Sequence, residues 1–199
     1  AGVPAHWPKD RSILLVVGQV ENDRSIMMGC GPDLRTNSGL VKAARADHPD
    51  AFLIYRNHPD VTAGNRPGLL DHAAMEEVDA SAADLDIVDC LNACDRLATL
   101  TSLTGFEALM RGKPVSVYGR PFYAGWGLTD DRLTFERRTR RATLDDVADN
   151  QGDGSWAVSA EVDGEGGLAT LGTGIDAPHA EGASTSRREW KSPWRMPIR

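Results

Sequence analysis

Four short segments rich in apolar residues recur along the first three quarters of the chain. They cover residues 12–17, 51–55, 96–100 and 114–118. Short apolar runs of this kind are typical of strands that are buried on both faces of a sheet. Stretches with a helical period separate the runs. Strands that alternate with helices predict a parallel sheet covered on both sides, and therefore a Rossmann-like α/β domain.

Helices are predicted between these strands, two of them before the third apolar segment and one after the turn at 101–105. The first ends at His48-Pro49, and the second covers about 83–93, whereas residues 19–37 are predicted to form a polar loop. Their apolar faces are expected to consist of Leu40, Val41 and Ala44 in the first helix and of Leu85, Val88 and Leu91 in the second.

A change in composition divides the chain into an N-terminal segment (1–11), a folded domain (12–149) and a tail (150–199). The tail is rich in Gly, Ala, Ser and Thr and has no period of 2 or 3.6 residues. Such a segment buries too little apolar surface to offset its ordering entropy. We therefore predict that the tail is mostly disordered.

The overall charge and the cysteines exclude several classes of protein. The net charge of −7 argues against binding to nucleic acid, which requires a basic surface. Three cysteines, an odd number, make no disulfide framework, and Cys90 and Cys94 are expected to be small buried hydrophobic residues rather than metal ligands. Without a segment that could span a bilayer or a signal-like start, a cytoplasmic location is expected.

The turn after the third apolar run has the residues of a phosphate site. Its hydroxyls belong to Thr101, Ser102 and Thr104. Gly105 would let backbone N–H groups approach an anion at the N-terminus of a helix. Glu107, one turn later, is placed to reach a sugar hydroxyl. The alternative is an ordinary helix cap, in which Ser102 or Thr104 satisfies a backbone N–H.

The tripeptide His-Pro-Asp occurs on both sides of the second apolar run, at 48–50 and 58–60. In open α/β sheets ligands bind beyond the carboxyl ends of the strands. His58 is therefore predicted to be a phosphate ligand on a loop that Pro59 stiffens. His48 is predicted to stop a helix at the opposite edge of the sheet. The loops at Gly18–Asp23 and Gly119–Gly127 should share the edge of His58. The dinucleotide fingerprint G-x-G-x-x-G is missing, which leaves nucleotide-sugar chemistry as the favoured use of the site.

Four segments resemble the capsular polysaccharide biosynthesis proteins, bacterial β-Kdo glycosyltransferases. They are GQVENDRSI at 18–26, YRNHPDVTAG at 55–64, TSLTGFEAL at 101–109 and YGRPFYAGWGLT at 118–129. The order and spacing match over about residues 12–148. The resemblance implies one Rossmann half of a GT-B-like, retaining transferase, the half that binds the donor CMP-Kdo. It also implies a phosphatidylglycerol-type lipid acceptor, capsule assembly proteins as partners and peripheral contact with the inner membrane.

By this resemblance the family's nucleotide loop is His58-Pro59 and its phosphate turn is Thr101, Ser102 and Thr104. The acidic loop would be Gln19, Glu21 and Asp23, with Gln19 and Glu21 holding donor hydroxyls and Asp23 either assisting or capping a turn. Phe122, Tyr123 and Trp126 either pack over the cytosine base or pack on the domain itself. A single phosphate needs no metal and no further cofactor, so neither is expected.

Two departures from the family and two alternative functions qualify this hypothesis. Arg56-Asn57 stands where the family usually has Lys-Pro, and the match to the family stops near Asp149. A complete transferase also needs an acceptor half, which this sequence does not include. The chain alone is therefore expected to be inactive. The first alternative is a transferase or epimerase that uses a UDP-sugar. The second is a non-catalytic nucleotide-binding partner in capsule export. The arginines of 132–141 face either an anionic lipid or solvent.

Overall fold

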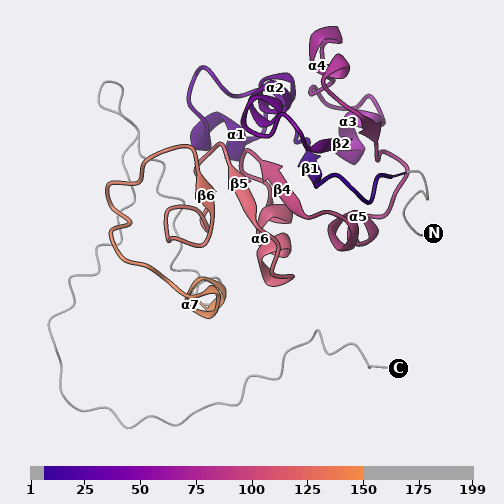
Figure 1. The fold of residues 1–199 in the computed structure, drawn as a ribbon. Coiled ribbons are helices and arrows are strands. Elements are labelled where there is room, and N and C mark those ends of the chain that lie inside the picture. The colour runs from indigo at the N-terminus through magenta and orange to yellow at the C-terminus, as the bar shows by residue number, and fades with distance from the viewer. Residues whose placement is uncertain (1–6, 150–199) are drawn as a thin grey trace, which may run out of the picture.

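Six parallel strands form a single sheet in the computed structural model, which describes residues 7–149 (Figure 1). The predicted tail lies outside the described residues. In chain order the strands are β1 (Ile13–Val17), β2 (Phe52–Arg56), β3 (Ala80–Ser81), β4 (Arg96–Thr99), β5 (Val115–Val117) and β6 (Asp130–Asp131). Their order in the sheet is β3-β2-β1-β4-β5-β6, so β1 pairs with β2 on one side and with β4 on the other.

Helices cover both faces of this sheet. They are α1 (Arg24–Gly29), α2 (Asn37–Asp47), α3 (Pro59–Thr62), α4 (His72–Glu76), α5 (Ile87–Ala93), α6 (Leu103–Met110) and α7 (Leu144–Asp149). Alternate side chains of a strand point to opposite faces. Leu15 and Val17 accordingly pack with α5 and α6, and Leu14 and Val16 pack with α1 and α2. The predicted Rossmann-like α/β fold is confirmed.

The four apolar runs are confirmed as β1, β2, β4 and β5, whereas the helix predictions need three corrections. The predicted loop 19–37 contains α1, whose buried contacts come from Ile26 and Gly29. The second predicted helix begins at Ile87 rather than near 83, because Asp86 caps it by accepting a hydrogen bond from the Val88 N–H. Val88 is 43% exposed, so the core face of α5 is made by Cys90 and Leu91 instead.

All three cysteines are buried and free, as the sequence predicted for Cys90 and Cys94. Cys30 packs on the side of the sheet covered by α1 and α2, and Cys90 and Cys94 pack on the other side. Burial raises the pKa of Cys30 and of Cys94 to about 11, although nearby Arg35 and Lys113 act in the opposite direction. At neutral pH these thiols are protonated and behave as small hydrophobic side chains.

Candidate functional site

The predicted site residues follow the carboxyl ends of neighbouring strands. Residues 18–23 follow β1, His58 comes shortly after β2, Thr101 and Ser102 follow β4, and the loop 119–127 follows β5. Since the strands are parallel, these segments share one edge of the sheet. The connections leaving β1 and β4 run in opposite directions along the sheet, which is the switch point where open α/β sheets bind ligands.

The side chain of Gln19 bridges this switch point. Its Nε2 donates to Thr101 Oγ1 (3.0 Å), and its Oε1 accepts from the Thr101 N–H (2.8 Å). The backbone of Gln19 is held in turn by Asn37, which accepts from the Gln19 N–H (2.9 Å) and donates from Nδ2 to the Gln19 carbonyl (2.7 Å). Gln19 was predicted to hold donor hydroxyls, but here both ends of its amide fix the turn after β4. Sequence reasoning missed Asn37, which is fully buried in the predicted loop.

We expect Gln19→Ala to lower the free energy of unfolding by about 1 kcal/mol, because it removes both side-chain hydrogen bonds to Thr101 and leaves the Thr101 N–H without this acceptor. Chemical denaturation of the full chain measures the change. Gln19→Glu is the matched control: its carboxylate still accepts from the Thr101 N–H but no longer donates to Thr101 Oγ1. An alanine variant as stable as the original would show that the bridge contributes nothing.

Ser102 begins α6 and serves as its cap. Its Oγ accepts from the Thr104 N–H (3.2 Å) and lies 3.2 Å from Thr104 Oγ1, while its own N–H donates to Thr99 Oγ1 (3.2 Å). The capping alternative is therefore correct for Ser102. The hydroxyls of Thr101, Ser102 and Thr104 are nonetheless partly exposed at the start of α6. Because Thr101 Oγ1 accepts from Gln19, its own hydrogen is available to donate to an anion.

The structure gives Gly105 a different role from the predicted one. Gly105 is buried, and its N–H donates to the Ser102 carbonyl (3.0 Å) within the first turn of α6. A Cβ at this position would lie 2.1 Å from the hydroxyl oxygen of Tyr123. Gly105 therefore makes room for a tyrosine rather than for a ligand.

The aromatic loop after β5 packs on the domain, as its second interpretation proposed. Tyr123 is completely buried, so its suggested contact with a base is wrong, and burial raises its pKa. Phe122 and Trp126 are partly buried against the same core cluster, and the Phe122 ring lies 5.1 Å from that of Phe106. These rings complete the sheet face that α5 and α6 cover.

His58 is the N-cap of α3, and its ring orientation is defined by that role. Its Nδ1 accepts from the Asp60 N–H (3.2 Å), and Pro59 occupies the first helical position. An accepting Nδ1 places the proton of the neutral ring on Nε2. The side chain is 40% exposed, and its Nε2 takes no part in the capping bond and can donate to a ligand.

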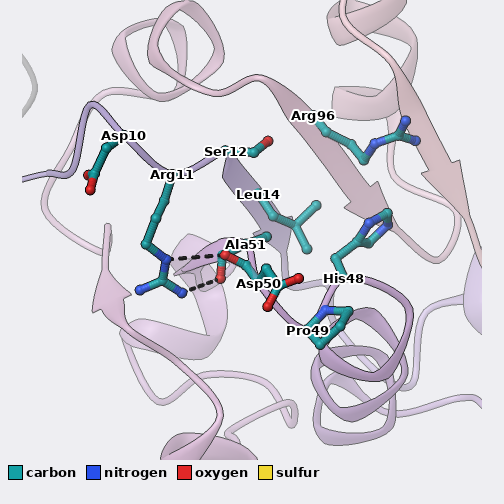
Figure 2. A pocket seen from close by; sticks show the side chains of 9 residues that line it. All are labelled: Asp10, Arg11, Ser12, Leu14, His48, Pro49, Asp50, Ala51 and Arg96. Carbon is teal, nitrogen blue, oxygen red and sulfur yellow. Dashed lines mark hydrogen bonds between the residues drawn. The ribbon is translucent and has the colours of Figure 1, made fainter.

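His48 lies at the opposite edge, as predicted, where it is the C-cap of α2. It lines an open cavity of about 370 Å³ at the amino ends of β1 and β4, together with Leu14 and Arg96 (Figure 2). Its Nε2 is 3.4 Å from Ser116 Oγ. Burial and the Arg96 guanidinium lower the pKa of His48.

The remaining acidic candidates are engaged in local structure. Glu21 Oε1 accepts from the Asn37 N–H (2.7 Å), and Asp23 accepts from the Arg24 N–H (2.6 Å) at the start of α1. The capping role considered for Asp23 is thus present. Glu107 is half-buried on α6.

The predicted arginine run packs partly against the protein rather than facing only lipid or solvent. Arg132 pairs with Asp47 (2.7 Å) and Asp130 (2.8 Å), and Arg138 lies over the ring of Trp126 (5.2 Å). Within residues 7–149, no helix is long and apolar enough to cross a membrane, and no group of three or more His, Cys, Asp or Glu side chains is placed to hold a metal ion.

A sequence profile of the capsule polysaccharide biosynthesis proteins matches residues 3–151. The chain belongs to this family. It is 50% identical over 136 residues to the capsule polysaccharide modification protein LipA of Neisseria meningitidis serogroup B, and 46% identical over 141 residues to the lipopolysaccharide-processing protein LpsZ of Rhizobium meliloti. These matches cover 68% and 70% of this chain but only 19% of LipA and 32% of LpsZ, so the chain spans less than a third of these relatives.

Solved structures of Thermosulfurimonas dismutans KpsC share the fold. One, a β-Kdo 2,7 transferase, is 38% identical with a TM-score of 0.62 over 70% of this chain and 44% of KpsC. The other, a β-Kdo 2,4 transferase, is 35% identical with a TM-score of 0.62 over 73% of this chain and 46% of KpsC. This member of the capsule polysaccharide biosynthesis family therefore has the fold of part of a Kdo transferase.

Proposed function

We propose that this chain supplies the donor-binding half of a retaining β-Kdo glycosyltransferase whose donor is CMP-Kdo. The observation that carries the proposal is the set of hydrogen-bond donors that follow the carboxyl ends of β2 and β4, at the edge of the sheet where the switch point lies. It consists of the hydroxyls of Thr101, Ser102 and Thr104 at the start of α6, with His58 on the loop after β2. The likeness to KpsC, which transfers Kdo, supports this choice of sugar.

The donor set suits a single phosphate group. In CMP-Kdo the phosphate is a diester with one negative charge, and it becomes a monoester with a second charge when the bond to the sugar breaks. Fixed donors at this position stabilise the charge that develops on the leaving CMP. The α6 N-terminus contributes its partial positive charge, and the Nε2–H of His58 contributes one donor. This chemistry requires neither a metal nor another cofactor.

The lipid acceptor requires residues beyond this chain under the proposal. The relatives are three to five times as long as the matched region, as their covered shares of 32% and 19% show. We assign the phosphatidylglycerol-type acceptor and the assembly of the capsule machinery at the cytoplasmic side of the inner membrane to the whole protein. The present chain would bind the donor and would not transfer the sugar by itself.

Calorimetric titration of the full chain with CMP and with UMP, each in the presence of a chelator, tests the proposal. We expect CMP to bind more tightly than UMP and the affinity to be unchanged by the chelator, because hydroxyls, backbone and imidazole form the proposed site. A preference for UMP would favour a UDP-sugar enzyme. Absence of binding to either nucleotide would contradict the donor assignment.

A measurement of sugar transfer distinguishes the proposed enzyme from the second alternative, a non-catalytic nucleotide-binding partner in capsule export. The longer protein that contains this sequence should transfer Kdo from CMP-Kdo to a lipid acceptor. Tight binding of CMP without any transfer by that longer protein would favour the non-catalytic partner.

A further inference from the structure

Tyr123 reaches from the loop after β5 to the turn that begins α6. Its hydroxyl donates to the carbonyl oxygen of Ser102 at 2.5 Å. The same carbonyl accepts from the N–H of Gly105, three residues later. Tyr123 thus fixes the peptide unit that joins Ser102 to Leu103. This peptide carries the turn on which the proposed phosphate donors stand.

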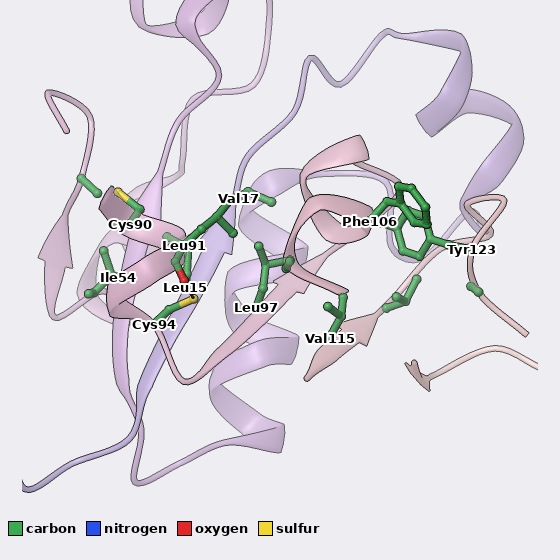
Figure 3. Packing of buried hydrophobic residues seen from close by; sticks show 14 of the residues in the cluster. Leu15, Val17, Ile54, Cys90, Leu91, Cys94, Leu97, Phe106, Val115 and Tyr123 are labelled. Carbon is green, nitrogen blue, oxygen red and sulfur yellow. Dashed lines mark hydrogen bonds between the residues drawn. The ribbon is translucent and has the colours of Figure 1, made fainter. Parts of the chain in front are cut away.

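Packing leaves the Tyr123 ring little freedom to move. The ring stacks on Phe106 with centroids 6.1 Å apart and meets Phe122 edge-on at 5.2 Å. Figure 3 shows the rings of Phe106 and Tyr123 next to each other. Gly105 closes the remaining side, since even one added carbon there would overlap the hydroxyl. A hydroxyl enclosed in this way defines the position of the Ser102 carbonyl.

The loop that carries Tyr123 is held from two sides. Arg138 donates from Nη1 to the carbonyl of Pro121 (2.9 Å) and also to that of Ala124, on either side of Tyr123 in the chain. The carboxylate of Asp131 accepts from the Gly125 N–H (2.9 Å). The guanidinium of Arg138 also lies 4.8 Å from the centroid of the Phe135 ring. Arg138 and Asp131 therefore fix the loop on which Tyr123 stands.

We propose that the buried hydroxyl of Tyr123 is a positioning group for the donor phosphate, acting through the backbone of Ser102 and held in place by Arg138. The inference rests on the proposed donor site at the start of α6. Tyr123 touches no ligand in this scheme. It sets where the hydroxyls of Thr101, Ser102 and Thr104 stand relative to the phosphate, and so determines the affinity for the phosphate part of the nucleotide alone.

Tyr123→Phe tests this, because it removes the hydroxyl and keeps the ring. Binding of CMP and of cytidine to the full chain is measured by calorimetry, with cytidine used as a competitor if it binds weakly. We expect CMP affinity to fall about three- to tenfold, the effect of one hydrogen bond, while cytidine affinity stays the same. A general loosening of the fold would weaken both ligands together, so an equal loss for CMP and cytidine would overturn the proposal.

Tyr118→Phe is the matched control. Tyr118 is also buried, and its hydroxyl donates to Asp47 Oδ2 (2.7 Å) rather than to the α6 turn. We expect it to leave the ratio of CMP to cytidine affinity unchanged. If the original chain binds CMP and Tyr123→Phe binds it equally well, the positioning role fails and the donor site stands. If the original chain does not bind CMP, the proposed function fails first.

Discussion

Gly105→Ala is expected to lower the free energy of unfolding by about 2 to 3 kcal/mol, the cost of overpacking a closed site. The added carbon would lie 2.1 Å from the Tyr123 hydroxyl oxygen and 2.7 Å from the ring carbon that bears it. The ring cannot turn aside, because it is fully buried and its hydroxyl is bonded to Ser102. Alanine favours a helix interior over glycine by about 1 kcal/mol, but this gain is smaller near the first turn and does not offset the overlap.

Denaturant unfolding of the two forms measures the difference, and Gly31→Ala provides the control. Nothing lies within 4 Å of the position that a Cβ would take at Gly31. That substitution should change the unfolding free energy by less than about 0.5 kcal/mol. If both alanine variants proved equally stable, the close approach of Tyr123 to α6 would be wrong. Weaker CMP binding in Gly105→Ala would accompany the overlap, since the same turn carries the proposed donors.

His58→Ala is expected to weaken CMP binding by about 1 to 3 kcal/mol, the range for losing a hydrogen bond to a charged group. The imidazole has an Nε2–H that can donate to a ligand because its Nδ1 is occupied by the Asp60 N–H. His48→Ala should change binding by less than about 0.5 kcal/mol, because His48 lies at the other end of β2. Calorimetry with CMP measures both.

A third variant separates binding from capping in this comparison. His58→Asn retains an oxygen that can accept from the Asp60 N–H, since asparagine is a favoured N-cap, but it lacks the extended donor of the imidazole. It should keep the stability of the original chain and lose affinity for CMP. Equal losses from His58→Ala and His48→Ala would place the nucleotide elsewhere on the molecule.

The interior of the sheet was predictable from the sequence, and its edges were not. A strand buried on both faces is rich in apolar residues along its whole length, as β1, β2, β4 and β5 are. The strands β3 and β6 have two residues each, and β6 consists of Asp130 and Asp131. Such strands are held by pairing with a neighbour rather than by their own hydrophobicity, so they carry no local pattern. The short helix α1 was not predicted for a similar reason, because Ile26 is its single buried large side chain and gives no helical pattern.

For the site, the sequence indicated which loops lie close together, but not which hydrogen bonds their side chains form. Gln19 and Thr101 are 82 residues apart, and their mutual hydrogen bonds depend on β1 and β4 being neighbours. An amide beside a predicted ligand site is equally suited to binding sugar and to bonding a backbone. Gly105 presented the same ambiguity, because a glycine needed for packing and a glycine needed for anion approach look alike in a sequence. Only the position of Tyr123 distinguishes them.

The three buried cysteines can report when the helices on either side of the sheet open locally. Cys30 lies under α1 and α2, whereas Cys90 and Cys94 lie on the opposite side of the sheet. Because burial keeps these thiols protonated, an alkylating reagent modifies them only when the surrounding layer opens. Mass spectrometry of the labelled peptides would then give separate opening rates for the two layers. Added CMP should slow alkylation on the α6 side most, so ligand binding can be followed without introducing a probe.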